Sequence, residues 1–241
     1  MLLAPPPDPP RDEDELLGRA RRLAGHRLGD IARAHHQRVP RSLKSQKGWV
    51  GNLIEVALGA RAGSKPVPDF EHLGIELKTL PIGANGRPRE STFVCTLPVD
   101  MLDEPDWATS HVRRKLHRVL WIPVQADPDL PIAERRVGSA LLWSCDGEDG
   151  PALRADWEEL TALVRMGYID DLTAHRGRYL QVRPKALTSD ETRLTVGEDG
   201  WLVATRPRGF YLRASFTATL LAQHYAGSTP RRAADPGGEP T

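Results

Sequence analysis

Three residues, Asp69, Glu76 and Lys78, have types and a spacing that could support metal-dependent chemistry. Residues i and i+2 of a β-strand point to the same face, so Glu76 and Lys78 would project together from a strand over residues 74–80. Asp69 lies just ahead of this strand, where a loop could fold it against Glu76. We expect the two carboxylates to lie close together, with a lysine beside them.

This combination suits the hydrolysis of a phosphodiester. Carboxylate oxygens are ligands that fit Mg²⁺, which keeps several waters and takes few protein ligands. A lysine beside the metal can orient a water or steady charge on the phosphate that is attacked. The D-x₆-E-x-K pattern is short, however, and a charged outer strand face with an incidental acid upstream would give the same pattern.

Glu55 adds a third acid to the hypothesis. It is the only charged residue in the apolar segment 49–58 (WVGNLIEVAL), which predicts a buried helix ended by Gly59. A carboxylate in such surroundings is costly unless it is paired, hydrogen-bonded or metal-bound. Glu55 could instead lie on a narrow solvent-exposed stripe with Asn52. A helix acid followed by an acid and an E-x-K strand is the arrangement of restriction-endonuclease-like nucleases.

Further elements must position these residues. Helices are predicted over residues 13–24, around 28–32, and over 152–166 and 215–225; strands are predicted over 91–97, 118–124, 138–143, 179–182 and 209–212. Strands interrupted by helices favour an α/β or α+β domain with a mixed sheet. The proline-rich residues 1–12 are expected to form a flexible arm and residues 227–241 a disordered tail. We expect residues 13–226, between these two segments, to form a single domain.

Composition excludes some classes of protein and leaves others open. The 241 residues carry a formal net charge of +1, so the overall balance does not indicate a nucleic-acid partner. Cys95 and Cys145 stand in no zinc-binding spacing and are expected to be free thiols. The sequence has no apolar run of roughly 18 residues that could span a membrane. We expect a cytoplasmic protein.

The distribution of charge is more informative than its sum. Three acid-free basic runs occur, and they contain Arg113, Arg114, Lys115 and Arg118; Arg176, Arg178, Arg183 and Lys185; and Arg206, Arg208 and Arg213. Together they favour one basic face that binds phosphates, although a solvated helix face remains open for the first run. The tryptophans at 49, 107, 121, 143, 157 and 201 are expected to lie in the core rather than to stack on bases.

Six long blocks of the sequence carry a resemblance to known proteins: KGWVGNLIEVALGARAGSKPVPDFEHLGIELKTLP (47–81), STFVCTLP (91–98), TSHVRRKLHRVLWIPV (109–124), RRVGSALLWS (135–144), GRYLQVRPKA (177–186) and PRGFYLRASFTATLLAQHY (207–225). In these blocks the chain resembles the MutH family of mismatch-repair endonucleases. The resemblance spans roughly residues 10–226 and departs from the family pattern between 186 and 206. It implies a restriction-endonuclease-like α/β fold, with a mixed central sheet flanked by helices and two lobes that form a DNA-binding cleft.

The resemblance also implies roles for individual residues. Asp69 and Glu76 match the metal-binding carboxylates, Lys78 the catalytic lysine and Glu55 the additional helix acid. Two further lysines match basic residues that contact phosphate or support the active site, and five residues match the DNA-contacting positions that read the sequence or its methylation. These are Lys47 and Lys115, and then Phe93, Arg183, Pro184, Lys185 and Tyr211.

Physical arguments support part of this recognition set. Arginine and lysine can read guanine through its O6 and N7 atoms. Tyr211 could reject a methylated adenine sterically if it packs where the methyl group must sit. From the residues alone, Tyr211 could equally be an ordinary core aromatic within the segment GFYL.

The function implied by the resemblance is strand-selective nicking of double-stranded DNA. A monomeric enzyme would bind GATC and cut the unmethylated strand of a hemimethylated site with Mg²⁺, after activation by the MutL protein. Two alternatives stay open: a GATC-specific restriction endonuclease, which would cut unmethylated DNA without a partner, and a non-catalytic DNA-binding module of the same fold. The intact set of Glu55, Asp69, Glu76 and Lys78 argues against the module.

Overall fold

The computed structural model describes residues 8–60, 67–98, 106–169, 172, 175–185, 193–196 and 201–228. Its helices are α1 (Glu13–Leu23), α2 (Leu28–Ala34), α3 (Trp49–Leu58), α4 (His111–Leu116), α5 (Gly150–Arg165) and α6 (Ala214–Ser228), with 3₁₀ turns η1 (Glu71–Leu73) and η3 (Ile132–Glu134). Each helix expected from the periodicity is present. The basic segment before residue 118, for which a helix face was one alternative, contains α4.

The strands form two three-stranded sheets and a hairpin. The first sheet has the order β1-β3-β4, from β1 (Glu76–Ile82), β3 (Arg118–Gln125) and β4 (Leu141–Ser144); β1 and β3 are parallel, and β3 and β4 are antiparallel. The second is antiparallel with the order β2-β8-β5, from β2 (Thr92–Thr96), β8 (Arg208–Leu212) and β5 (Leu180–Pro184). Among the described strands, β6 (Arg193–Val196) and β7 (Leu202–Thr205) pair only with each other.

The mixed α/β architecture is as predicted, but the strands do not all join one central sheet. Periodicity predicts strands without predicting their neighbours, and β2 takes a partner from the far end of the chain, with Thr92 opposite Leu212. Among the described strands, β1 therefore lies at an edge of the mixed sheet. Its residues at the start of the strand are open to contacts from loops and from other elements.

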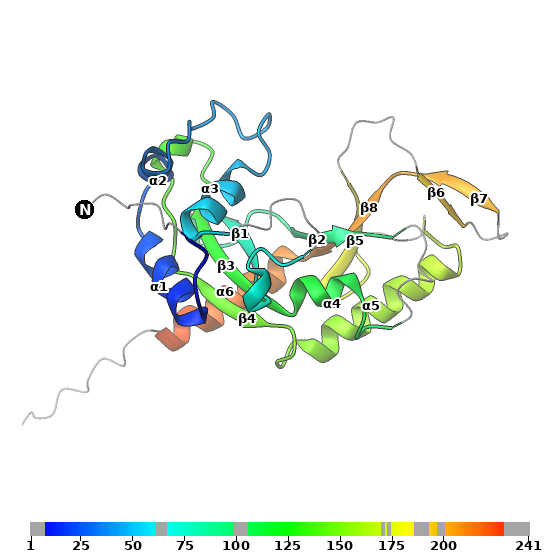
Figure 1. Cartoon of the computed structure of the whole chain (residues 1–241). Helices are drawn as coiled ribbons and strands as arrows, with labels where there is room; N and C mark the ends of the chain where they lie inside the picture. Colours follow the sequence, from blue (N-terminus) through cyan, green and yellow to red (C-terminus); the bar gives the residue numbers. More distant parts are fainter. Residues whose placement is uncertain are drawn as a thin grey trace, which may run out of the picture.

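The mixed sheet separates two hydrophobic clusters, because alternate residues of its strands point to opposite faces. On one face, Leu77, Leu120 and Ile122 pack with residues of α1, α2 and α3. On the other face, Val119 and Trp121 pack with the second sheet and with α4, α5 and α6. In Figure 1, α1–α3 lie at one end of the molecule, β2, β5 and β8 lie toward the other, and the mixed sheet runs between them.

Glycine ends the helix that carries the third acid, as the sequence predicts. Gly59 has the left-handed φ of 87°, which an L residue with a side chain rarely adopts, and its N–H donates to the Glu55 carbonyl at 2.9 Å. A Cβ at Gly59 would also lie 2.9 Å from the carbonyl oxygen of Asp8. The chain before α1 is therefore packed against the end of α3.

Three further expectations concern the two ends of the chain, the cysteines and the possibility of a membrane-spanning helix. Residues 1–7 of the predicted arm and 229–241 of the predicted tail lie outside the described residues, whereas Pro10 is buried and its carbonyl lies 2.6 Å from Nε2 of His72. Cys95 and Cys145 are buried, and within the described residues neither forms a disulfide. Among the described helices, none is long and apolar enough to cross a membrane.

The expectation of a core position is wrong for one tryptophan. Trp201 is 78% exposed, at the start of β7. The β6–β7 hairpin lies at the end of the molecule away from α1–α3 (Figure 1), and neither hydrophobic cluster includes Trp201. Trp107, Trp121 and Trp157 are buried, as expected.

Candidate active site

A closed loop brings the first acid to the start of β1. The backbones of Phe70 and Ile75 pair with each other, through N···O distances of 2.9 and 3.3 Å. Between them the chain makes the η1 turn and then passes through Gly74, whose φ of 64° lies in the left-handed region. Asp69, just outside the closed loop, accepts a hydrogen bond from the Leu77 N–H on Oδ2 at 2.7 Å. The loop thus accounts for the spacing between the first acid and the E-x-K strand.

Glu76 is buried between two ammonium groups. Its side chain is 8% exposed; Oε1 lies 3.3 Å from Nζ of Lys78, and Oε2 lies 2.9 Å from Nζ of Lys115. Lys115 comes from α4 and also donates to the carbonyl of Val67 at 3.2 Å. Because both lysines are largely buried as well, water screens these contacts weakly. The structure therefore brings Lys115 to the E-x-K pair from a segment 39 residues away.

Glu55 belongs to the same cluster. Its pKa is raised to about 7, first by burial, then by the carboxylates of Asp69 and Glu76, while Lys78 and Lys115 oppose the shift. The side chain is half-buried rather than turned fully to solvent, in contrast to the exposed Asn52. Of the two interpretations left open by the sequence, the structure favours the one in which Glu55 faces the other acids.

The two lysines do not cancel the negative charge of this cluster. The pKa of Asp69 is also raised, by burial and then by Glu76. Repulsion between neighbouring carboxylates is part of the cause of both shifts, and a further cation would relieve that repulsion. Glu55, Asp69, Glu76, Lys78 and Lys115 form what we call the acid–lysine cluster.

The donor chemistry of the cluster fits Mg²⁺ in its usual, sparsely liganded mode. Carboxylate oxygens are its preferred protein ligands, and Asp69 and Glu76 offer them from adjacent backbone segments. Within the described residues, no group of three or more His, Cys, Asp or Glu side chains is placed so that it could enclose a metal ion. An ion held here would therefore complete its shell with water or with phosphate oxygens.

A second group of predicted residues meets on the antiparallel sheet. The rings of Phe93 and Tyr211 are in edge-to-face contact, with centroids 5.3 Å apart. Lys185 Nζ lies 5.0 Å from the centre of the Phe93 ring, and the Arg183 guanidinium lies 5.9 Å from the centre of the Tyr211 ring. We call Phe93, Arg183, Lys185 and Tyr211 the aromatic–basic cluster.

The strands explain why these four side chains share a face. In β8, Phe210 and Leu212 point into the hydrophobic core, so Tyr211 between them points the other way. Phe93 is 38% exposed. The alternative that Tyr211 is an ordinary core aromatic is therefore not supported. Pro184 is exposed and lies between the two basic residues of the cluster, on the opposite face of β5.

Hydrogen bonds fix the two basic side chains, and nothing in the sequence pattern indicates their partners. Arg183 donates to Oγ of Ser91 at 2.6 Å, and Lys185 donates to Oγ1 of Thr96 at 3.0 Å. Both acceptors flank or end β2, the strand that carries Phe93. The pairing of β2 with β8 makes these contacts possible, and an alternating pattern in a single strand cannot reveal it.

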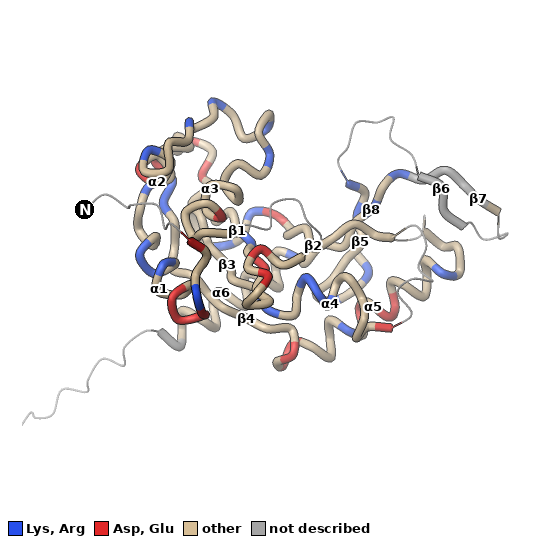
Figure 2. Tube along the Cα trace, in the orientation of Figure 1, with Lys and Arg blue, Asp and Glu red and all other residues tan. Residues whose placement is uncertain are grey.

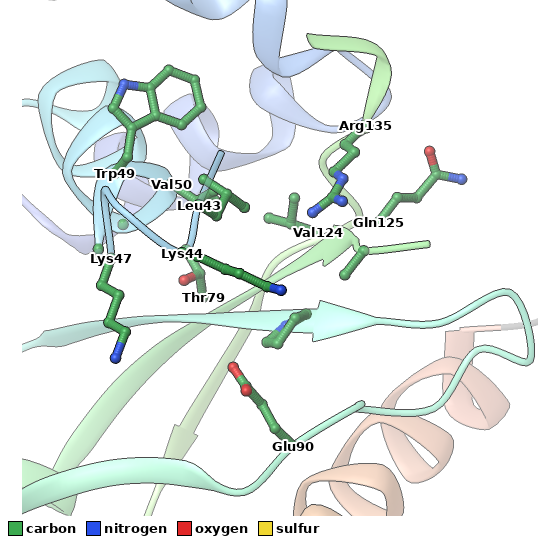
Figure 3. Close-up of a pocket in the computed structure, with 14 residues that line it drawn as sticks. Leu43, Lys44, Lys47, Trp49, Val50, Thr79, Glu90, Val124, Gln125 and Arg135 are labelled. Atoms are coloured by element: carbon green, nitrogen blue, oxygen red, sulfur yellow. The ribbon is translucent and has the colours of Figure 1, made fainter. Parts of the chain in front are cut away.

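Lys47 does not reach the acid–lysine cluster through a described contact; it lines a neighbouring pocket. This pocket has a volume of about 500 Å³ and lies between the loop before α3 and the part of β1 that contains Thr79. Lys44, Glu90 and Arg135 also line it. Figure 3 shows Lys47 on the side of the pocket toward the start of β1, with Lys44 and Arg135 pointing into its middle. Basic positions follow one another along the loop that joins α2 to α3 (Figure 2).

Several members of the basic runs are engaged elsewhere. Arg113 pairs with Asp146 at 2.8 Å, Arg118 pairs with Glu13, and Arg176 lies 3.4 Å from Glu159. In the first two runs, three arginines are therefore paired with acids, and whether the three runs form one phosphate-binding face stays a prediction. Acids that are distant in the sequence approach these arginines in the fold, and charge counted along the chain cannot reveal them.

Comparisons with known proteins agree on one family. The model of the family "DNA mismatch repair enzyme MutH" matches residues 58–156. The chain is 52% identical over 224 residues to the DNA mismatch repair protein MutH of Serratia proteamaculans (strain 568), covering 93% of this chain and 98% of that protein. It is 50% identical to the MutH proteins of Klebsiella pneumoniae (strain 342) and Escherichia coli O6:K15:H31 (strain 536 / UPEC), over 92% and 90% of this chain and 96% and 95% of theirs.

Proposed function

The chain belongs to the MutH family of DNA mismatch repair enzymes, and from this premise we propose that it nicks the unmethylated strand of DNA at hemimethylated GATC sites. The observation that carries the proposal is the acid–lysine cluster, in which three carboxylates and two ammonium groups meet beside an edge strand. A structural ion pair would need one acid for each lysine. The surplus of acids is what a hydrolase that uses Mg²⁺ requires.

The residues of the cluster suit distinct parts of the reaction. Asp69 and Glu76 would hold Mg²⁺, which when bound polarises a phosphate oxygen and lowers the pKa of water. Lys78 would donate hydrogen bonds to the phosphate while charge builds on it. The pKa of Glu55, about 7, suits it to accept the proton of the attacking water near neutral pH. Water would add to phosphorus as Glu55 takes its proton, the P–O bond to the leaving sugar oxygen would break, and that oxygen would take a proton from another water.

Lys115 would support this arrangement rather than react. It bridges Glu76 and the carbonyl of Val67, so it ties the start of β1 to the loop ahead of Asp69. The position of one metal-binding acid is thereby fixed against the segment that carries the other. The role agrees with the place of Lys115 on α4, which packs against β2 and β3.

We assign DNA recognition to the aromatic–basic cluster together with Pro184 and Lys47. Arg183 and Lys185 can donate to guanine O6 and N7. The Tyr211 ring would occupy the space that the methyl group of a methylated adenine requires, and Phe93 would contact the bases. Pro184 would shape the strand between the two basic residues, and Lys47 would contact phosphate.

The same proposal extends to the organisation of the chain. We assign residues 13–226 to one restriction-endonuclease-like nuclease domain, with the acid–lysine cluster in a catalytic lobe and the second sheet in a recognition lobe. DNA would lie between the two lobes. The enzyme would act as a monomer and would require MutL for full activity.

A nicking assay with a matched pair of variants tests the proposal. The substrate is a hemimethylated GATC duplex with Mg²⁺, with and without MutL. We expect Glu76→Ala to lose nicking by on the order of 100-fold or more while GATC binding stays largely intact. Glu71→Ala removes an exposed acid of the adjacent loop and should nick normally.

Two results would contradict the proposal. Nicking by Glu76→Ala near the rate of the unmodified enzyme would remove the assignment of the active site. Strong cutting of both strands of unmethylated DNA without MutL would indicate a restriction endonuclease instead.

A further inference from the structure

A carboxylate outside both clusters is built into the base of the recognition strand. Asp156 lies in α5 and is only 6% exposed. Its Oδ1 accepts from the N–H of Arg178 at 2.7 Å, and its Oδ2 accepts from the N–H groups of Tyr179 at 2.6 Å and Leu180 at 2.8 Å. Both oxygens are thus occupied by three successive backbone donors where the chain enters β5.

The same turn is held from its other side. Arg213, directly after β8, donates from Nε to the carbonyl of Gly177 at 3.0 Å and from its guanidinium to the carbonyl of Arg176 at 2.7 Å. Gly177 has a φ of 76°, and a Cβ there would lie 2.0 Å from the Leu180 carbonyl oxygen. The turn therefore has a single tight conformation, with its N–H groups held by Asp156 and its carbonyls by Arg213.

This turn leads directly into the strand that carries the basic residues of the aromatic–basic cluster. In the described sheet, β5 is an edge strand with β8 as its neighbour, and Arg183 stands opposite Gly209. A side chain moves to the other face of a sheet when its strand slips by one residue. A change of register at residues 178–180 would therefore move the cationic groups of Arg183 and Lys185.

We infer that Asp156 is a positioning residue for sequence recognition: through the backbone at residues 178–180 it holds Arg183 and Lys185 in register with Phe93 and Tyr211. Asp156 itself need not touch DNA. The inference deepens the proposed function and rests on it. It predicts that the loss of Asp156 impairs discrimination between DNA sequences more than it impairs binding to DNA in general.

Asp156→Asn is the informative substitution because it preserves the shape of the side chain. An asparagine has one acceptor oxygen and one NH₂ group, so a donor would face at least one of the three backbone donors. The matched control is Asp12→Ala. Asp12 accepts from the N–H of Glu15 at 2.8 Å at the start of α1, so that variant loses a carboxylate–backbone hydrogen bond in a different part of the molecule.

Two measurements on the full chain test the inference. The first is the ratio of the Kd for a noncognate duplex to the Kd for a hemimethylated GATC duplex, without Mg²⁺. We expect Asp156→Asn to reduce this ratio about tenfold or more, as when one base contact is lost, with noncognate affinity within about twofold of the unmodified protein and the control unchanged. The second is amide hydrogen exchange of the free protein, which should accelerate both at residues 178–180 and further along β5.

The outcomes separate the inference from the proposed function. If the unmodified protein prefers GATC and a folded Asp156→Asn variant keeps that preference, the inference is overturned. If the unmodified protein has no such preference, the proposed function fails, and the positioning role of Asp156 is then tested by hydrogen exchange alone. In that case, an exchange rate that does not increase in β5 beyond residue 180 overturns the positioning role. Should Asp156→Asn fail to fold, Arg213→Gln loosens the same turn from its other side and is judged by the same two measurements.

Discussion

The carboxylates around Glu76 differ in their surroundings although they lie together. Glu76 has an ammonium group on each oxygen, and Asp69 has a backbone N–H. The structure gives Glu55 no comparable ion pair, and burial together with two neighbouring acids raises its pKa to about 7. Glu55 therefore has a pKa close to neutral pH because of its position in the fold.

This difference predicts how the stability of the metal-free protein depends on pH. Glu55 has an ordinary pKa of 4.5 when unfolded and about 7 when folded, so between these values the folded state binds more protons. The contribution of Glu55 to stability should fall as pH rises from about 4.5 to 7 and should be constant above that range. Melting temperatures in EDTA across the range measure the effect, and Glu55→Gln should flatten the slope.

The control for this prediction is Glu71→Gln, which changes an exposed acid of the neighbouring loop. It should leave the slope as it is. Mg²⁺ should stabilise the unmodified protein more at pH 8 than at pH 5, because ionised carboxylates bind it. An unchanged slope in Glu55→Gln would mean that Glu55 does not titrate as the structure indicates.

Among the helices and strands, much of this fold could be predicted from hydrophobic spacing. The apolar run of α3 and the alternation of β1 predict both elements with nearly their observed bounds, and Gly59 ends the helix as expected. That Glu76 and Lys78 lie on the same face could be predicted from the two-residue period of a β-strand alone. These are local properties of the chain, and local properties are what a sequence records most directly.

Contacts between distant segments could not be predicted in the same way. The pattern of STFVCTL predicts a strand but does not indicate that its neighbour is β8, and so the antiparallel sheet was not expected as a separate unit. Lys115 joined the site hypothesis only through the resemblance to a family, since nothing near it in the sequence is acidic. Trp201 was misplaced because composition does not record which strands lie outside the core.

The loop ahead of β1 allows a prediction about how an element positions a side chain. Gly74 has a φ of 64°, and a Cβ there would meet no described atom within 4 Å, so a substitution acts on the backbone alone. Gly74→Ala should destabilise the protein by about 1–2 kcal/mol, the cost of the left-handed conformation. It should also slow nicking, because the Asp69 carboxylate would lose its place beside Leu77.

Gly74→Asn is the matched variant, because asparagine tolerates the left-handed region better than alanine does. Its melting temperature and nicking rate should lie between those of alanine and of glycine. Equal rates for all three proteins would show that the conformation of the loop does not set the position of the first acid.

The net charge of +1 does not show which basic side chains on the surface are paired with acids and which could contact phosphate. Arg113, Arg118 and Arg176 each have an acidic partner. The loop that carries Lys44 and Lys47 has basic residues at several separate positions (Figure 2) and borders a pocket beside β1. Phosphates should therefore be attracted to particular parts of the surface rather than to the protein uniformly.

The dependence of DNA binding on salt tests this division. Each phosphate contact adds about one unit to the slope of log Kd against log salt concentration. Lys47→Ala should lower the slope by roughly 1 for a noncognate duplex, because we assign Lys47 to phosphate. Arg118→Ala makes the same change in net charge but removes the partner of Glu13, and it should leave the slope nearly unchanged. Fluorescence anisotropy between about 50 and 200 mM salt measures both variants. Equal reductions in the two would mean that DNA responds to net charge alone, and the assignment of Lys47 to phosphate would be wrong.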